Sequence, residues 1–421
     1  MHFGSKPIKK TRWVVLTVCA LRVAAPVWAD DGANDAGQFA QRDGWLHLLW
    51  NARLRHEQVD DDAYARTALA ETLRLRLGLR ADLGSGWSSY LEGAGTASAG
   101  NHYNSGANAQ TQYPVINDPR GTQLNQVWVR WQGSQIDATV GRQELVLDNQ
   151  RWVGNVDWRQ FEQTFDAVAL QWQPARNWTV HYDWLDHVYR VAGPDAINPL
   201  ASARDLDTNL LNAAYVRGTQ QWVGYVYLHD DHDVATASTG TYGLRWSGKP
   251  IAADGGFGWT LEAARQVDYA NNPLDFAHSY WLLEPAWRYS TITAKLGWEH
   301  LGGDGSHALQ TPLATLHTFN GWDDQFLTTP AGGLEDRYAN ITGAPTRASD
   351  ILGKLGWVVA YHDFHAVHGG RYGNEWDASL MFPLAPGLQG LLKAADYRAD
   401  GFGRNDTKLW LQLEWKGQHD L

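Results

Sequence analysis

Histidines and acids occur in two groups whose residue types could bind a metal ion. Residues 229–233 read HDDHD, and His362, His365 and His368 recur every third residue. Imidazole and carboxylate are common zinc ligands. On an extended strand, however, a step of three residues places neighbouring side chains on opposite faces, so these histidines converge only across a loop or bulge. The spacing therefore favours solvated loop residues, and the sequence predicts neither a metal site nor a cofactor.

Acidic runs and serines lack the partners that catalysis needs. Asp60, Asp61 and Asp62 are consecutive, as are Asp323 and Asp324, but no candidate base accompanies either run. The Gly-x-Ser-x-Gly nucleophile motif is absent from the sequence. We therefore expect a protein that is not an enzyme.

Arginines are the residues whose type and spacing most clearly indicate a function. Two segments near the start of the chain carry arginines two residues apart, and more follow in the next third. The predicted pore-lining set is Arg53, Arg55, Arg74, Arg76, Arg80, Arg130, Arg142, Arg151 and Arg159, together with Asp166. Guanidinium groups bind carboxylates through paired hydrogen bonds, and rings of arginine in a pore favour anionic solutes. The alternative, left open by the sequence, is that these arginines merely pair with acids such as Asp82, Glu92 or Asp166.

The segments that carry these arginines alternate with a period of two. Between Leu69 and Leu83 the odd positions are mostly leucine, whereas the even positions include Arg74, Arg76 and Arg80. Successive side chains of a strand point to opposite faces, so this segment has one apolar and one basic face. Its fifteen residues exceed an ordinary strand. A membrane is crossed by about 9 to 11 residues of tilted strand, so this segment is long enough to span one.

Similar alternation recurs at residues 45–55, 178–184, 292–298 and 408–415. Clusters of Gly, Asn, Asp or Pro separate sixteen to eighteen such segments. The chain also holds 23 Trp and 17 Tyr, often near segment ends, as the aromatic girdles of membrane barrels require. We therefore predict an all-β fold, a transmembrane antiparallel β-barrel of about 18 strands. A secreted soluble β protein acting on polysaccharide is the alternative.

Residues 1–29 have the features of a secretory signal peptide. Basic residues precede an apolar run at residues 13–21, and Ala29 is a small residue suited to cleavage. The barrel domain is then residues 30–421, which contain no cysteine because Cys19 is the only one. Closure of a barrel pairs every backbone amide and so stabilises a chain without disulfides. We expect export to a Gram-negative outer membrane, with membrane lipid around the barrel.

Composition excludes two other classes of protein. The formal net charge is −11, and no domain is strongly basic, so nucleic acid is not an expected partner. The mean hydropathy is negative and no apolar run of about 18 residues follows the signal, which excludes a helical membrane protein. The long polar stretches are predicted loops, in one of which an inward-folded segment would be sought; they are residues 93–121, 143–164, 190–207 and 300–333.

The most specific motif of the chain is TPLATLHTFNGWDDQFLTTP at residues 311–330, followed by GLED at 333–336. It resembles a motif of the alginate-export family of outer-membrane channels. Other similar motifs are GRQ at 141–143, NQRWVG at 149–154, WRQ at 158–160, FDA at 165–167, YHDF at 361–364 and YGNEWD at 372–377. Together these motifs extend over most of the chain after the signal.

The resemblance implies a monomeric eighteen-stranded barrel whose arginine-lined, anion-selective lumen lets a uronate polymer leave the cell. Four residues lie inside the matched motifs and carry the family's expected role in the lumen: Arg142, Arg151, Arg159 and Asp166. The other arginines rest on periodicity.

These observations predict a passive outer-membrane channel for hydrophilic anionic solutes or an exported uronate polysaccharide such as alginate, supplied by partners in the periplasm. A general or neutral-sugar porin is a second alternative, in which inward aromatics such as Trp45 or Trp128 stack on the sugar.

Overall fold

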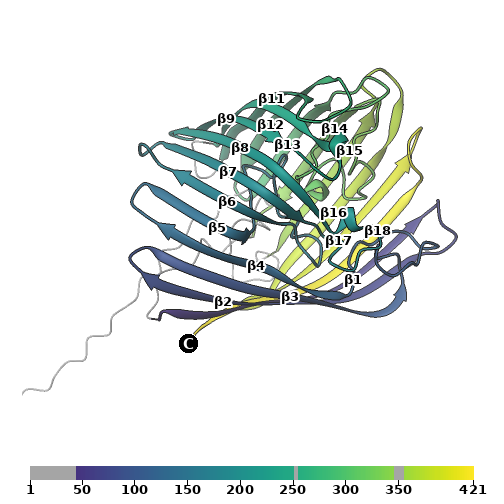
Figure 1. The fold of residues 1–421 in the computed structure, drawn as a ribbon. Coiled ribbons are helices and arrows are strands. Elements are labelled where there is room, and N and C mark those ends of the chain that lie inside the picture. Colours follow the sequence, from purple (N-terminus) through teal and green to yellow (C-terminus); the bar gives the residue numbers. More distant parts are fainter. Residues whose placement is uncertain (1–43, 251–254, 346–354) are drawn as a thin grey trace, which may run out of the picture.

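The computed structural model describes residues 44–250, 255–345 and 355–421, which form one closed antiparallel β-barrel (Figure 1). Its strands are β1 (Leu46–Asp61), β2 (Ala68–Gly84), β3 (Trp87–His102), β4 (Gly121–Gln132), β5 (Ile136–Gln143), β6 (Thr164–Trp172), β7 (Trp178–Tyr189), β8 (Ala203–Arg217), β9 (Gln220–His229), β10 (Thr239–Gly248), β11 (Gly255–Asp268), β12 (Ala277–Tyr289), β13 (Ile292–Leu301), β14 (Leu334–Gly343), β15 (Gly356–His365), β16 (Arg371–Ala385), β17 (Leu388–Ala399) and β18 (Asp406–Asp420). The predicted fold class is confirmed, with eighteen strands.

Among the residues that the structure describes, helical structure is limited to three single turns in the loops: η1 (Pro199–Ala201), η2 (Ala235–Ala237) and η3 (Leu316–Thr318). Within the described ranges, no helix has the length and apolar character for crossing a bilayer. The signal peptide predicted at residues 1–29 lies outside the described residues and stays a prediction.

The first and last strands close the barrel. β1 pairs antiparallel with β18 from His47 opposite Asp420 to Asp61 opposite Asp406. β1 also pairs with β2 along its other edge, so both of its edges are hydrogen-bonded. Closure removes the open edges that a free sheet would present to lipid.

The apolar face of the strands points outward. On β2, Leu73, Leu75 and Leu77 are 43–48% exposed, whereas Arg74 and Arg76 between them are at most 5% exposed. A soluble β-sandwich would have the opposite arrangement, with leucines packed in its interior. The exposed leucines therefore face lipid, and the arginines face the lumen.

Connections differ between the two ends of the barrel. At the end that holds the C-terminus, tight turns such as Ser85–Gly86 join neighbouring strands. Long loops lie at the other end, which in such barrels is the cell exterior. Two predicted loops are shorter than expected, because β3 continues to His102 and β8 begins at Ala203. Residues 93–102 and 203–207 are therefore strand.

Two long loops fold into the barrel and contact each other there. We call residues 144–163 the first inward loop and residues 302–333 the second. Val153 and Leu313 form a parallel bridge, and the Gly154 amide donates to the Leu313 carbonyl at 2.9 Å. These loops coincide with the predicted polar stretches 143–164 and 300–333, and they are the elements that define the site inside the lumen.

Candidate functional site

The arginines of β1 and β2 form one basic surface inside the barrel, which we call the arginine wall. It consists of Arg53, Arg55, Arg74 and Arg76, none more than 5% exposed. Arg53 lies opposite Arg74 in the pairing of β1 with β2, so guanidinium groups are immediate neighbours. Like charges opposite one another on adjacent strands are destabilising. This wall therefore needs anions beside it.

Asp157, in the first inward loop, is the central anion. Its Oδ1 lies 2.9 Å from Arg74 Nη1 and 2.8 Å from Arg76 Nη2. Its Oδ2 lies 3.2 Å from Arg53 Nη2. Burial by itself would raise the pKa of Asp157, but the three guanidinium groups outweigh burial and hold the pKa well below its usual range. Asp157 is therefore a fixed anion shared by three arginines.

Two further acids complete the charge balance of the wall. Glu414 on β18 places Oε1 3.0 Å from Arg53 Nη2 and 3.1 Å from Arg74 Nη2. Glu162, at the end of the first inward loop, places Oε2 2.8 Å from Arg76 Nη1. Burial raises the pKa of Glu162 to about 6, although Arg76 opposes the shift. The arginines are thus neutralised mainly by loop and β18 carboxylates.

The fourth arginine of the wall binds the loop backbone and a tryptophan. Arg55 Nη2 donates to the Trp158 carbonyl at 2.7 Å, and its guanidinium lies 4.0 Å from the centre of the Trp158 ring. Both Nε and Nη2 also donate to Gln412 Oε1. The carboxylate of Asp118 lies 3.5 Å from Arg55 Nη1. Hydrogen bonding and cation–π contact therefore hold the loop against the wall.

The first inward loop extends from the arginine wall to the opposite side of the barrel. Arg151 Nε lies 2.8 Å from Glu299 Oε1 on β13, and Trp152 Nε1 donates to Glu262 Oε1 on β11 at 2.8 Å. Since β11 and β13 lie across the barrel from β1 and β2, the loop spans the lumen.

Arg159 joins the two inward loops. Its Nη1 lies 3.3 Å from Glu57 on β1, and its Nη2 lies 3.0 Å from Asp324 in the second inward loop. Asp324 in turn accepts a hydrogen bond from His317 Nδ1 at 2.8 Å. One arginine therefore connects a wall strand with both loops.

His317 is a neutral imidazole that links the second inward loop to β17. Burial lowers the pKa of His317 to about 3. With Nδ1–H donating to Asp324, Nε2 is free to accept a hydrogen bond from Lys393 Nζ at 2.7 Å. The ring also stacks on Trp158, with centroids 4.5 Å apart.

Lys393 is surrounded by tryptophans from both loops. Its Nζ lies 4.1 Å from the ring centre of Trp158 in the first loop and 3.9 Å from that of Trp322 in the second. A third ring, Trp410 on β18, lies at 5.4 Å. Cation–π attraction is strongest where the cation is desolvated, so this lysine fastens both loops to the β17–β18 side of the barrel.

Two cavities lie between the inward loops and the end of the barrel that holds the C-terminus. The larger has a volume of about 310 Å³ and is lined in part by Trp158, Lys393 and Lys416. The smaller has a volume of about 170 Å³ and includes Arg245 and Lys295. Both are bordered by two residues of the second loop, Thr318 and Trp322. Lysine and arginine side chains therefore line both cavities.

Arg142 and Asp166 do not face the lumen, so their prediction as pore-lining residues is wrong. Arg142 shares one face of β5 with Val140, which is 55% exposed, and pairs with Asp166 across the β5–β6 ladder. The two form an ion pair at 2.9 Å, beside the ring of Tyr189. Strand alternation, and not membership in a motif, decides the face of a residue.

Arg80 and Arg130 lie on the inward face of their strands but outside the arginine wall. Arg80 Nη2 lies 3.0 Å from Asp82, and Arg130 Nη2 lies 2.7 Å from Asp137. The sequence left open that these arginines pair with acids, and the structure shows such pairs, although the Arg142–Asp166 pair lies on the outward face of the barrel. Every arginine of the predicted set has a carboxylate partner within ion-pair distance; Asp82 and Asp166 are among the three partners named from the sequence.

Sequence reasoning did not identify the acids that matter most. Asp157, Glu162 and Glu414 come from a loop and from the last strand, far along the chain from β1 and β2. The only available signal was that Asp157 and Glu162 fall in a predicted long loop, next to the motif arginines Arg151 and Arg159.

The sequence profile of the alginate export family matches residues 45–288. The chain belongs to this family. No curated protein sequence matches the chain.

Solved outer-membrane protein structures share the fold of this alginate export family member. OpdK from Pseudomonas aeruginosa is 14% identical, with a TM-score of 0.68 over 89% of this chain and 99% of that chain. OccK9 (OpdG) from the same organism is 14% identical, with a TM-score of 0.71 over 90% and 100% of the two chains. OccAB4 from Acinetobacter baumannii is 12% identical, with a TM-score of 0.69 over 90% and 99%.

Family and fold together identify a passive outer-membrane channel. The predicted location in the outer membrane and the predicted transport class are confirmed. The matched family is described as one of alginate export, which is a transport function.

Proposed function

We propose that this channel carries anionic solutes, above all a uronate polysaccharide such as alginate, along the arginine wall. The observation that carries the proposal is the contact of one loop carboxylate, Asp157, with three arginines. A wall that binds one carboxylate through several guanidinium groups has the chemistry to bind the carboxylates of a uronate chain. Membership in the alginate export family supports the same class of cargo.

In this proposal the first inward loop closes the lumen by occupying the arginines itself. Asp157 and Glu162 hold the positions that cargo carboxylates take during passage. Exchange of one carboxylate for another leaves no buried arginine without a partner, so it avoids the cost of an unpaired buried charge. Weak, exchangeable binding at several sites is also what conduction requires.

A small aromatic carboxylate is a second candidate cargo. The cavity of about 310 Å³ below the loops places the ammonium of Lys393 beside the rings of Trp158 and Trp322. One similar structure, 15% identical, is that of OpdK with vanillate. Stacking on tryptophan combined with a nearby cation suits an aromatic acid.

The channel is further proposed to work as a single chain in contact with lipid and supplied by periplasmic partners. Both edges of β1 are paired within the same chain, so the barrel needs no second copy to close it. The exposed leucines of β2 supply apolar surface for lipid contact.

Currents through planar bilayers test the proposed cargo. In a salt gradient, the reversal potential of the purified channel is expected to show anion preference at neutral pH. Oligouronates are expected to block the current, whereas neutral oligosaccharides of equal length are not. Vanillate in place of the oligomer tests the second candidate. Cation preference, or equal block by neutral and acidic oligomers, would overturn the proposal and favour a general porin.

Matched variants connect the result to the arginine wall. Arg74→Gln removes one guanidinium group from the wall, and Arg398→Gln removes one from an exposed pair with Asp396. A hydrogen bond between charged groups contributes about 1.5–3 kcal/mol, so block by oligouronate is expected to weaken roughly tenfold to a hundredfold in Arg74→Gln. It is expected to stay unchanged in Arg398→Gln.

A further inference from the structure

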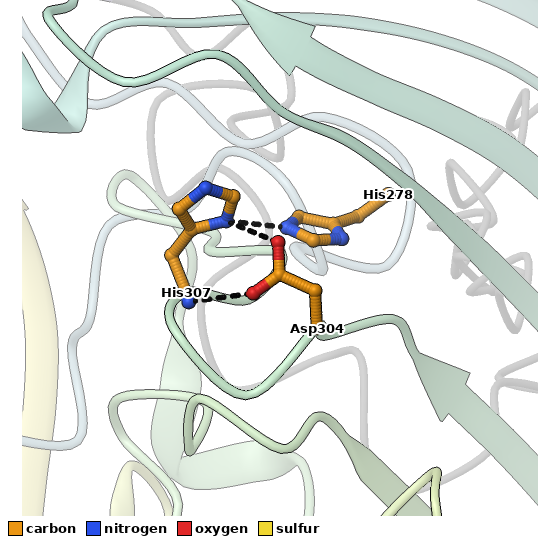
Figure 2. A group of neighbouring side chains, drawn as sticks. All are labelled: His278, Asp304 and His307. Atoms are coloured by element: carbon orange, nitrogen blue, oxygen red, sulfur yellow. Dashed lines mark hydrogen bonds and ion pairs between the residues drawn. The ribbon is translucent and has the colours of Figure 1, made fainter.

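Three side chains with metal-binding atoms converge where the second inward loop begins. Figure 2 shows His278, on β12, facing Asp304 and His307 in the loop. His278 Nε2 lies 2.8 Å from His307 Nδ1, and His307 Nδ1 lies 3.4 Å from Asp304 Oδ2. All the ligand atoms of the trio lie within 4.8 Å of one another. The sequence did not indicate this group, because β12 and the loop turn are more than twenty residues apart.

Asp304 is held in position before any ion binds. Its Oδ1 accepts hydrogen bonds from the Ser306 amide at 2.8 Å, the Ser306 hydroxyl at 2.6 Å and the His307 amide at 3.0 Å. These bonds engage one carboxylate oxygen and leave Oδ2 directed at the two imidazoles, as Figure 2 shows. Little reorganisation of the carboxylate is therefore needed for metal binding.

His278, which lies on strand β12 of the barrel, is also restrained. The ring of His278 stacks on Phe276 with centroids 5.3 Å apart, and Phe276 also contacts the ring of His307 at 4.9 Å. His278 is buried, whereas Asp304 is exposed. An ion can therefore reach the trio from solvent at the mouth of the barrel, while His278 remains packed on strand β12.

We propose that His278, Asp304 and His307 bind a zinc-type transition metal ion through His278 Nε2, His307 Nδ1 and Asp304 Oδ2. Zinc bonds to nitrogen and oxygen ligands are about 2.0–2.2 Å long, which puts ligand atoms of a tetrahedral site about 3.3 Å apart. The separation of 3.4 Å between His307 and Asp304 meets this requirement. The two ring nitrogens, now 2.8 Å apart, move apart by about half an ångström when the ion replaces the hydrogen bond between them.

The ligand types select the class of ion. Two imidazole nitrogens and one carboxylate oxygen suit Zn²⁺, Ni²⁺ or Cu²⁺, whereas Mg²⁺ and Ca²⁺ prefer oxygen ligands alone. Two neutral imidazoles and one carboxylate give the site a single negative charge, which favours a dication. Three protein ligands leave at least one position for water.

Metal binding at this trio would fix the start of the second inward loop to the barrel wall. Asp304 and His307 flank a tight turn in which the Asp304 amide donates to the His307 carbonyl at 3.1 Å. Next to this turn, Gly303 and Ala308 form an antiparallel bridge. A metal ion bonded to His278 adds a link between this turn and β12. The same loop carries His317, Trp322 and Asp324, so the ion stabilises the closed arrangement of the lumen.

Zinc binding by the full-length channel, purified in detergent and stripped with EDTA, tests the proposal. Competition with a chromophoric zinc chelator measures stoichiometry and affinity. The wild type is expected to hold one more zinc ion than His307→Ala, or to bind it at least about tenfold more tightly, because even loss of residues outside the ligand shell weakens metal sites about 10–100-fold. A hundredfold excess of Mg²⁺ is expected to leave the zinc affinity unchanged.

Matched variants separate this site from background binding by the 16 histidines of the chain. His232→Ala removes a loop histidine that lies 3.6 Å from Asp230, and it is expected to retain wild-type zinc binding. Asp304→Asn changes only an exposed loop residue, and heat-dependent gel mobility verifies that its barrel is folded. The proposal is overturned if Asp304→Asn and His307→Ala bind zinc like the wild type, or if His232→Ala loses as much affinity as they do.

Discussion

Replacing Asp157 by asparagine is the sharpest perturbation of the closed lumen. The substitution keeps the size of the side chain and removes the one charge that contacts three arginines. In the closed arrangement the Glu414 carboxylate then remains as the anion beside Arg53 and Arg74, and the Glu162 carboxylate remains as the anion beside Arg76. In an open arrangement the same arginines face water or cargo, so the substitution costs little there.

The size of the effect follows from burial. Asp157 and all three arginines are at most 7% exposed, so solvent screens their attraction weakly. Removing one partner of a buried ion pair costs about 3–5 kcal/mol. Asparagine still accepts a hydrogen bond, so the expected loss of stability of the closed loop is near the lower end of this range. A loss of about 3 kcal/mol shifts the balance between closed and open lumen roughly a hundredfold towards open.

Single-channel recording in planar bilayers measures this balance. Asp157→Asn is expected to raise the open probability and the anion selectivity together, because loop displacement exposes the arginine wall. Asp400→Asn is the matched control, since it makes the same chemical change in an exposed pair with Arg371. Exposed pairs are worth only about 0–1 kcal/mol, so this control is expected to behave like the wild type. Unchanged open probability and selectivity in a folded Asp157→Asn channel would refute the neutralising role of the loop.

Two other predictions concern pH and the lipid-facing surface. Burial raises the pKa of Glu162 in the closed loop to about 6, above the ordinary value of a glutamate. Protonation of Glu162 therefore stabilises the closed loop. This stabilisation is fully present at a pH below the ordinary glutamate pKa, and it is lost as pH rises through 6. The open probability is therefore expected to rise between pH 5 and pH 7, with a smaller rise in Glu162→Gln. If open probability depends on pH equally in the variant and the wild type, Glu162 is not the group responsible. Some slope remains in that variant because burial and Glu162 also raise the pKa of Glu144. On the outer surface, Leu75→Arg is expected to destabilise the barrel by about 2–4 kcal/mol in urea unfolding from lipid vesicles, whereas Leu75→Met is close to neutral; equal stability of the two variants contradicts lipid contact.

The sequence by itself determined the barrel and its two faces. A period of two is a local property of each strand, so Leu73 and Leu75 could be assigned to lipid and Arg74 and Arg76 to the lumen without knowledge of any other strand. The alternation of β18 likewise indicated a strand near the C-terminus, which the structure pairs with β1. Motif matches in the loops pointed to the correct family.

Only the tertiary structure decided which anions meet the arginines. Asp157 reaches the wall because its loop turns into the lumen, and Glu414 reaches it because β18 closes on β1. Both contacts join residues far apart in the chain, and no local pattern encodes them. Arg142 shows the converse, since a motif placed it in the lumen and its strand turned it outward. Charge balance in a closed barrel depends on all of its strands and on the loops inside it. The alternation of a single strand therefore predicts which arginines point inward, but only the folded barrel shows which carboxylates contact them.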